Sequence, residues 1–108
     1  NGSVQSTGVL RFGELQIDEV GRTVTVGGRS IQLTRIEYNL LSLLANHPGQ
    51  AFSRVQLLDR LHGVSHDGYD RSVDAHVKNL RRKIEEDAAN PVYVLTVYGT
   101  GYKFMERG

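Results

Sequence analysis

The sequence predicts a single α+β domain with a four-stranded antiparallel sheet first, then three helices, then a closing β-hairpin. Three observations predict this class. Short alternating runs fill the first third of the chain, the apolar period changes from two to about 3.6 at Thr34, and β-branched and aromatic residues return after Pro91. A length of 108 residues, 39% of them hydrophobic, suits one domain with one core.

Composition excludes several classes of protein. The chain has no cysteine, so disulfide scaffolds and thiolate metal sites are excluded. No apolar run approaches the roughly 20 residues that a membrane span needs, and the start lacks a signal-peptide pattern. We expect a cytoplasmic domain with no membrane partner.

Residues 1–8 are polar, glycine-containing and aperiodic, which is typical of a linker or a cloning remnant. The chain starts without methionine, so we expect a fragment whose missing part precedes this linker. The folded domain is then expected to span residues 9–108.

Four short strands are predicted from the alternation of apolar and polar residues. They are expected at Val9–Phe12, Glu14–Asp18, Arg22–Val26 and Arg29–Leu33. Gly27-Gly28 joins the last two, and a two-glycine connection between alternating runs is a strong hairpin signal.

Two capped helices are predicted next. Thr34 and Glu37 have the spacing of a capping box, and a broad apolar stripe follows until His47-Pro48-Gly49 ends the helix: Ile36, Leu40, Leu41, Leu43 and Leu44. Ser53 and Gln56 form a second box. Here Phe52 is expected to pack on Leu57, with Leu57, Leu58 and Leu61 as the buried face and His62-Gly63 as the end.

A glycine-bearing loop, residues 63–69, precedes the third helix, for which Asp70 is a plausible N-cap. This helix is predicted over residues 71–86. At about 100° per residue, one narrow stripe must face the core: Val73, Val77, Leu80 and Ile84. The opposite side carries Arg71, Ala75, Lys78, Asn79 and Arg82, with Ser72, His76 and Lys83 on one flank.

Positive charge is concentrated on this helix. The net charge of the chain is only +1, yet residues 71–83 hold five bases and one acid, Asp74, a local excess of +4. Clustering of this kind is the electrostatic footprint of a nucleic-acid partner, although a solvated basic face is the plain alternative.

The outer face of the helix suits the major groove of duplex DNA. Ala75 allows close approach, Arg82 can donate to guanine, and Asn79 can pair with adenine. His76 and Lys83, to one side, are better placed for phosphates. A hairpin is predicted over residues 92–105 around Gly99-Thr100-Gly101, and such a hairpin can reach the DNA backbone or the adjacent groove. The order of elements therefore predicts a winged helix-turn-helix domain.

At this point the residues resemble a known family. The run from Arg71 to Ile84 (RSVDAHVKNLRRKI) strongly resembles the recognition helix of OmpR/PhoB-type bacterial response regulators, and residues 96–103 (TVYGTGYK) resemble their wing. Leu33-Thr34 with Glu37 and Leu40-Leu41, and Phe52-Ser53-Arg54 with Leu57-Leu58, resemble their first two helices. The likeness runs from about Val9 to Phe104 in the right order.

The resemblance implies sequence-specific binding of double-stranded DNA as the output domain of a two-component transcriptional regulator. It also implies an N-terminal receiver domain outside this chain, a second copy bound head-to-tail on a direct-repeat promoter site, and RNA polymerase as a partner. The loop before the recognition helix would face the polymerase or the second copy; it comprises Gly63, Val64, Ser65, His66, Asp67, Gly68 and Tyr69.

Carried over by position, the family pattern assigns Arg71, His76 and Lys78 to phosphates and Asn79 and Arg82 to bases, with Thr96 on the backbone. The expected DNA-binding set adds Ser72, Ala75, Lys83, Tyr98, Thr100 and Lys103.

Two positions depart from the family pattern. Many relatives carry arginine where this chain has Tyr98, which can donate to a phosphate or stack on a sugar but cannot place a cation in the minor groove. Several carry arginine where this chain has Asn79, so an adenine contact is expected to replace a guanine contact.

Other functions were weighed. His62 and His66 are four apart, as in a helical zinc pair, with Asp67 nearby, but Gly63 interrupts the segment and loop histidines are favoured. No Ser/His/Asp arrangement has motif context, and Gly99-Thr100-Gly101 is too short for a phosphate cradle. We predict no catalysis, no metal and no cofactor. The alternative function is a winged helix that binds protein and not DNA.

Overall fold

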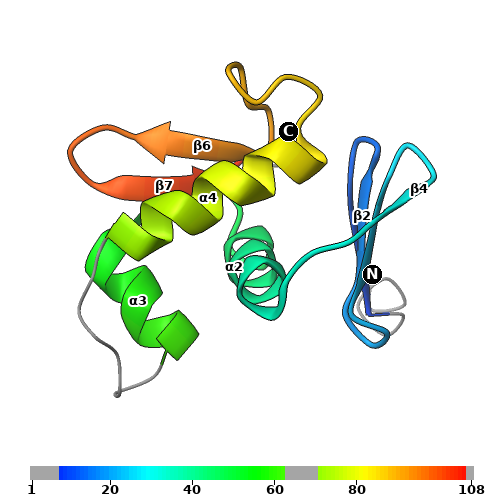
Figure 1. The fold of residues 1–108 in the computed structure, drawn as a ribbon, viewed down its shortest axis with the longest axis horizontal. Coiled ribbons are helices and arrows are strands. Elements are labelled where there is room, and N and C mark those ends of the chain that lie inside the picture. The colour runs from blue at the N-terminus through cyan, green and yellow to red at the C-terminus, as the bar shows by residue number, and fades with distance from the viewer. Residues whose placement is uncertain (1–7, 63–70, 107–108) are drawn as a thin grey trace.

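The computed structural model describes residues 8–62 and 71–106 (Figure 1). In these residues two β-sheets lie on either side of helix α2, and helix α4 crosses over α2 in front of the C-terminal sheet (Figure 1). The order of elements is the predicted one: four strands, three helices and a hairpin. The winged-helix class is thereby confirmed, with one short strand that the sequence did not predict.

The N-terminal sheet is an antiparallel meander of β1 (Val9–Phe12), β2 (Leu15–Asp18), β3 (Thr23–Val26) and β4 (Arg29–Ile31). Its inward residues are fully buried or nearly so: Phe12, Leu15, Ile17 and Val24. The predicted hairpin at Gly27-Gly28 is confirmed. Both glycines have positive φ, 58° and 84°, the conformation that a type I′ hairpin loop requires at both central positions.

Helix α2 (Arg35–Ala45) begins at the predicted capping box. The Thr34 hydroxyl accepts from the backbone N–H of Glu37 at 3.2 Å, and the Glu37 carboxylate accepts from the backbone N–H of Thr34 at 3.0 Å. Leu40, Leu41 and Leu44 have no exposed surface, so this helix forms the centre of the core.

The second capping box is also confirmed, at the start of α3 (Arg54–His62). The Ser53 hydroxyl accepts from the N–H of Gln56, and the Gln56 side chain accepts from the N–H of Ser53. Phe52 and Ser53 additionally form the strand β5, which pairs with β7. Two residues carry no periodicity, so no local pattern predicts this strand.

Helix α4 runs from Arg71 to Ile84, and the wing consists of β6 (Val94–Val97) and β7 (Gly101–Phe104). The predicted bounds, 71–86 and 92–105, therefore run one or two residues past these elements. Just after α4, the Glu85 carboxylate accepts from the backbone N–H groups of Val92, Tyr93 and Val94 at 2.7 to 3.2 Å, which fixes the start of the wing to the end of the helix.

The two sheets meet through aromatic rings in the core. Phe12 of β1 contacts Phe104 of β7 edge to face, with 4.6 Å between ring centroids, and Tyr93 stacks on the same ring at 6.2 Å. Part of the aromatic set in the wing is thus core, and the hairpin is fixed on the same core that α4 covers.

Candidate nucleic-acid interface

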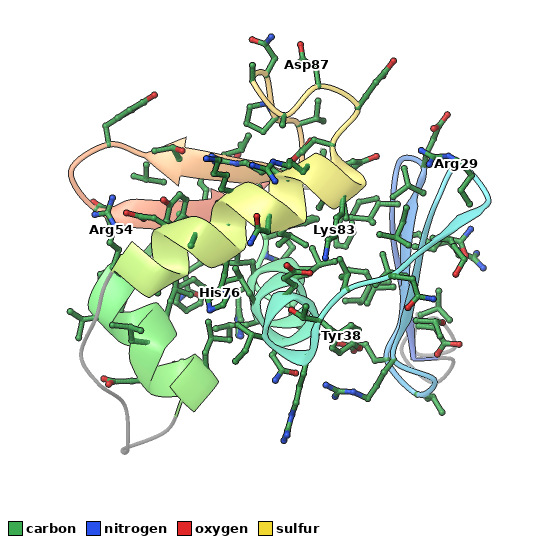
Figure 2. The ribbon with its side chains drawn as sticks, in the orientation of Figure 1. Arg29, Tyr38, Arg54, His76, Lys83 and Asp87 are labelled. Atoms are coloured by element: carbon green, nitrogen blue, oxygen red, sulfur yellow. The ribbon has the colours of Figure 1, made fainter. Side chains whose placement is uncertain are left out.

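Helix α4 has the two faces that its sequence predicts. The inner stripe is confirmed, because Val73, Val77, Leu80 and Ile84 are each at most 1% exposed. On the outer side Ala75, Lys78 and Arg82 are exposed, and Asn79 is half-buried beside them. His76 is also half-buried, on the side of α4 that faces α3 (Figure 2).

Arg81, counted in the basic cluster of the sequence, connects α4 to the wing. Its Nε donates to the carbonyl of Val94 at 3.0 Å, and its Nη2 donates to the hydroxyl of Thr96 at 2.8 Å. The guanidinium also lies over the ring of Tyr102, 5.5 Å from the centroid. These contacts fix the guanidinium against β6, on the protein side of the interface.

Lys83 forms an ion pair with Glu37, at 2.6 Å between Nζ and Oε1, from the side of α4 that faces α2 (Figure 2). Glu37 is only 2% exposed. Burial by itself raises the pKa of its carboxyl, but hydrogen bonds from Lys83 and Thr34 outweigh burial and hold the pKa below its ordinary value. The ammonium of Lys83 is therefore directed into the protein, and its predicted phosphate contact stays a prediction.

Asp74, the one acid among the bases, joins three elements. Its Oδ1 accepts from Nε of Arg54 in α3 at 2.8 Å and from the hydroxyl of Tyr102 in β7 at 2.6 Å. Burial raises the pKa of Asp74, and the hydrogen bonds from Tyr102 and Arg54 more than reverse that, so the net shift is downward. Sequence reasoning missed this role, although a lone acid in a basic cluster was a usable signal.

When the bases that bond to other parts of the domain are set aside, a smaller cationic surface remains on α4. Of the lysine and arginine side chains described on α4, Arg81 is held by β6 and Lys83 by Glu37, whereas Lys78 and Arg82 are exposed. Both line a groove of about 290 Å³ between α4, Tyr102 and the turn at Ala88-Ala89. The exposed cations thus face the gap between helix and wing.

The wing presents exposed polar side chains at Thr96, Tyr98 and Thr100. Tyr98 is 92% exposed and stands at the tip, in a turn closed by the N–H of Thr100 donating to the carbonyl of Val97 at 2.9 Å. Gly99 in this turn has φ of 83°. Lys103 is half-buried and lies 3.6 Å from Glu106.

Several of the predicted site residues lie outside the part of the chain that the structure describes. The loop from Gly63 to Tyr69 and the expected N-cap Asp70 are outside the described residues. Arg71 and Ser72 are the first two residues of α4, of which the structure describes the backbone alone.

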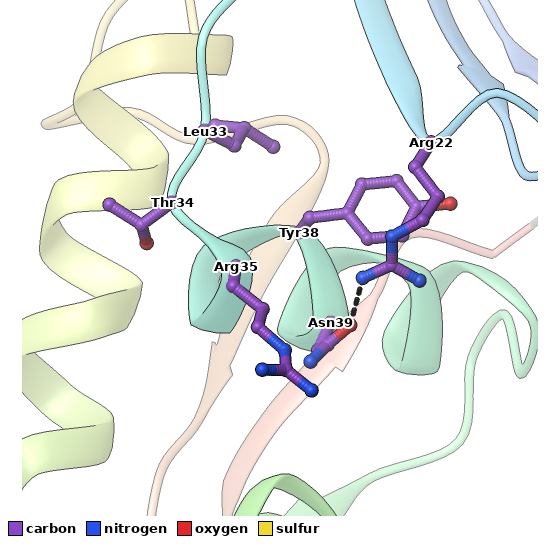
Figure 3. Close-up of a pocket in the computed structure, with 6 residues that line it drawn as sticks. All are labelled: Arg22, Leu33, Thr34, Arg35, Tyr38 and Asn39. Carbon is purple, nitrogen blue, oxygen red and sulfur yellow. Dashed lines mark hydrogen bonds between the residues drawn. The ribbon is translucent and has the colours of Figure 1, made fainter.

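A second hollow, of about 400 Å³, lies between α2 and the turn that joins β2 to β3 (Figure 3). Arg22 has a φ of 56°, unusual for a residue with a side chain. Its guanidinium stacks over Tyr38 at 4.4 Å from the centroid and donates to the amide oxygen of Asn39 at 2.8 Å (Figure 3). These contacts attach the N-terminal sheet to α2.

Within residues 8–62 and 71–106, no three His, Asp or Glu side chains are grouped as metal ligands. The described helices also include none with the length and apolar character of a membrane span.

Two consecutive helices pack on one core, the second has an exposed basic face, and a hairpin adjoins it. These features define a winged-helix domain. Comparison with known proteins agrees with this class. Residues 28–104 match the family described as "Transcriptional regulatory protein, C terminal". The chain therefore belongs to this family, the OmpR/PhoB-type effector domains of response regulators, as the sequence resemblance predicted.

Curated relatives include the sensory transduction protein RegX3 of Mycobacterium leprae, 46% identical over 91% of this chain and 50% of its own length. The transcriptional regulatory protein RstA of Escherichia coli is 45% identical over 88% of this chain and 40% of its own length. The chain thus spans half or less of the length of these curated relatives.

Solved structures similar to this chain are of the same type. The RstA DNA-binding domain of Klebsiella pneumoniae, in complex with the RstA box, is 41% identical with a TM-score of 0.81, covering 90% of this chain and 96% of that one. DrrB of Thermotoga maritima, an OmpR/PhoB homolog, is 36% identical with a TM-score of 0.85, covering 91% of this chain and 44% of that one.

Proposed function

We propose that this domain binds double-stranded DNA sequence-specifically, as the output domain of a transcriptional response regulator. The observation that carries the proposal is the outer face of α4, where two exposed cations flank a small residue and an amide: Lys78, Arg82, Ala75 and Asn79. A helix of this chemistry fits the major groove, because the groove admits a helix whose small residue lies against the base edges. Membership of the family supports the same function.

Within this proposal Arg82 and Asn79 donate to base edges and Lys78 contacts phosphate. His76 contacts phosphate at the rim of the interface, and Arg71 and Ser72 approach the backbone from the first turn of α4. Lys83 is left out of the proposed interface, because Glu37 holds its ammonium. The domain then acts by binding, without catalysis.

The wing supplies backbone contacts. The Thr96 hydroxyl accepts from Arg81, so its own hydrogen remains for donation to a phosphate. Tyr98 at the tip offers a neutral hydroxyl and ring to the backbone or the minor groove, with Thr100 and Lys103 beside the turn. A neutral tip adds no counterion release, so the salt dependence of binding arises mainly on α4.

The further partners are also proposals. The matched segments make up 50% and 40% of the two relatives, which supports a receiver domain joined to this one. We propose a second copy bound head-to-tail on a direct repeat, RNA polymerase recruitment through residues 63–69, and a cytoplasmic location.

The test is selection from a random duplex library with the isolated domain, followed by sequencing of the bound pool. The proposal predicts enrichment of a half-site, with direct repeats about 10–11 bp apart where two copies bind together. A pool without any enriched motif, retained equally at low and high salt, would instead support the alternative, a winged helix that binds protein.

A further inference from the structure

Three elements of the proposed interface meet at one carboxylate oxygen. Oδ1 of Asp74 in α4 accepts both from Arg54, at the start of α3, and from Tyr102, in β7 of the wing. Figure 2 shows Arg54 beside the first turn of α4, where this contact is made. The oxygen therefore joins the recognition helix to the helix before it and to the hairpin after it.

Tyr102 is the part of the wing that this contact holds. It is 7% exposed, and the guanidiniums of Arg54 and Arg81 lie over its ring, 5.9 and 5.5 Å from the centroid. Arg81 follows Asp74 by seven residues, which is about two helical turns along the same side of α4. Its bonds to β6 and the Tyr102–Asp74 bond thus fix the wing to α4 at two points.

Two contacts restrain both the distance and the tilt between helix and hairpin, whereas a single contact restrains only the distance. The groove between them is lined by Asp74, Lys78, Arg82 and Tyr102, so its width depends on the Asp74 contact. A phosphate backbone that meets α4 and the wing together requires a fixed width, because contacts made in register with the bases are lost when the spacing changes.

The charge of Asp74 supports this interpretation. The side chain is 42% exposed among cations that would face a polyanion, so as a mere surface residue it would weaken binding to any duplex. Its acceptor oxygen is used by two partners, which gives the carboxylate a positioning role.

We propose that Asp74 is a positioning residue for DNA recognition, which sets the spacing of wing and recognition helix through Tyr102 and thereby sets the ratio of specific to non-specific binding. This inference rests on the proposed function, namely that α4 and the wing bind one duplex.

The test compares dissociation constants for the selected duplex and for a scrambled duplex of equal length, at one salt concentration. Asp74→Ala and Tyr102→Phe are each expected to lower the specific-to-non-specific ratio about tenfold, equivalent to about 1.4 kcal/mol. The double variant is expected to lose no more than either single variant, because both remove the same contact. Asp74→Asn keeps an acceptor oxygen and is expected to retain most of the ratio.

Two matched controls are included. One controls for the loss of an acidic charge, and the other controls for the loss of a tyrosine hydroxyl. Glu86→Ala removes an exposed acid just after α4, and Tyr93→Phe removes the hydroxyl of a tyrosine just before β6; both should leave the ratio unchanged. Thermal unfolding follows the fold of every variant, and Tyr102→Phe keeps the ring that the guanidiniums of Arg54 and Arg81 contact. Hydroxyl-radical footprints should lose protection over the wing contact and keep it over the α4 contact.

A folded Asp74→Ala or Tyr102→Phe variant with the wild-type ratio of specific to non-specific binding would overturn the inference. A ratio that falls as far in Asp74→Asn as in Asp74→Ala would also overturn it. A wild-type domain with a ratio near one would instead overturn the proposed function itself, so the two failures are distinct.

Discussion

Lys83 in the last turn of α4 donates to Glu37, the residue whose carboxylate also caps α2, and one oxygen of Glu37 receives both bonds. The C-terminal end of the recognition helix is therefore held against the N-terminal end of α2. A cation that sequence position places on the DNA side is used to orient the helix within the domain.

Lys83→Met should destabilise the fold and leave the salt dependence of DNA binding unchanged. The change leaves the buried carboxylate of Glu37 with one donor fewer, a cost of about 2 kcal/mol. The measurement is thermal unfolding together with binding at several salt concentrations. Lys78→Met is the matched control and should lower the slope of log K against log salt by about 0.9, the value for one phosphate contact. An equal loss of slope in both variants would mean that Lys83 also contacts a phosphate.

Stability should fall in acid partly through Glu37. Because its pKa is lowered in the folded state, its contribution is complete above the pKa of the unfolded chain and is lost as the pH falls through the folded pKa. Glu37→Gln should therefore be less stable than wild type at pH 7, with the difference narrowing below about pH 4. Denaturant unfolding across this range measures it, and a difference that stays constant with pH would contradict the assignment.

Glu85→Ala should be among the most destabilising single changes in the loop before the wing. It removes the acceptor of the N–H groups of Val92, Tyr93 and Val94, at a cost of about 2–4 kcal/mol. Glu86→Ala, the exposed neighbour, should change stability by about 0.5 kcal/mol or less. Melting temperatures of the two variants check this, and similar values for both would show that the loop does not need the carboxylate.

Gly101→Ala should weaken the pairing of the wing with β5. A Cβ at Gly101 would overlap the carbonyl oxygen of Phe52, so β5 or β7 must move, at about 3 kcal/mol. At Gly99 the added Cβ meets open space and only the positive φ is disfavoured, so Gly99→Ala should cost about 1 kcal/mol. Chemical denaturation ranks the two, and the reverse order would mean that turn strain outweighs the contact of β5 with β7.

The elements that sequence predicted are those with local chemical signals. Two capping boxes, a two-glycine hairpin and a 3.6-residue apolar stripe each depend on residues within one turn or one connection of each other. Their geometry follows from neighbouring residues alone. The inner face of α4 was likewise predictable, because its angular positions follow from helix geometry.

Contacts between distant segments were not predictable from local pattern. Pairing of β5 with β7 joins residues about 50 apart, and the partners of Asp74, Arg81 and Lys83 come from other elements. Counting the bases along the helix therefore did not reveal that Arg81 and Lys83 bond to other elements of the domain. Glu85 was predicted as part of the helix, and nothing local shows that its carboxylate accepts from the start of the wing.

The central claim, that the outer face of α4 contacts bases, is tested most directly by repeating the library selection with Arg82→Ala. We expect the base preference to be relaxed at one base pair of the half-site and kept elsewhere, with a loss of about 1–3 kcal/mol at the wild-type site. An unchanged motif bound with unchanged affinity would contradict the docking of α4 in the major groove.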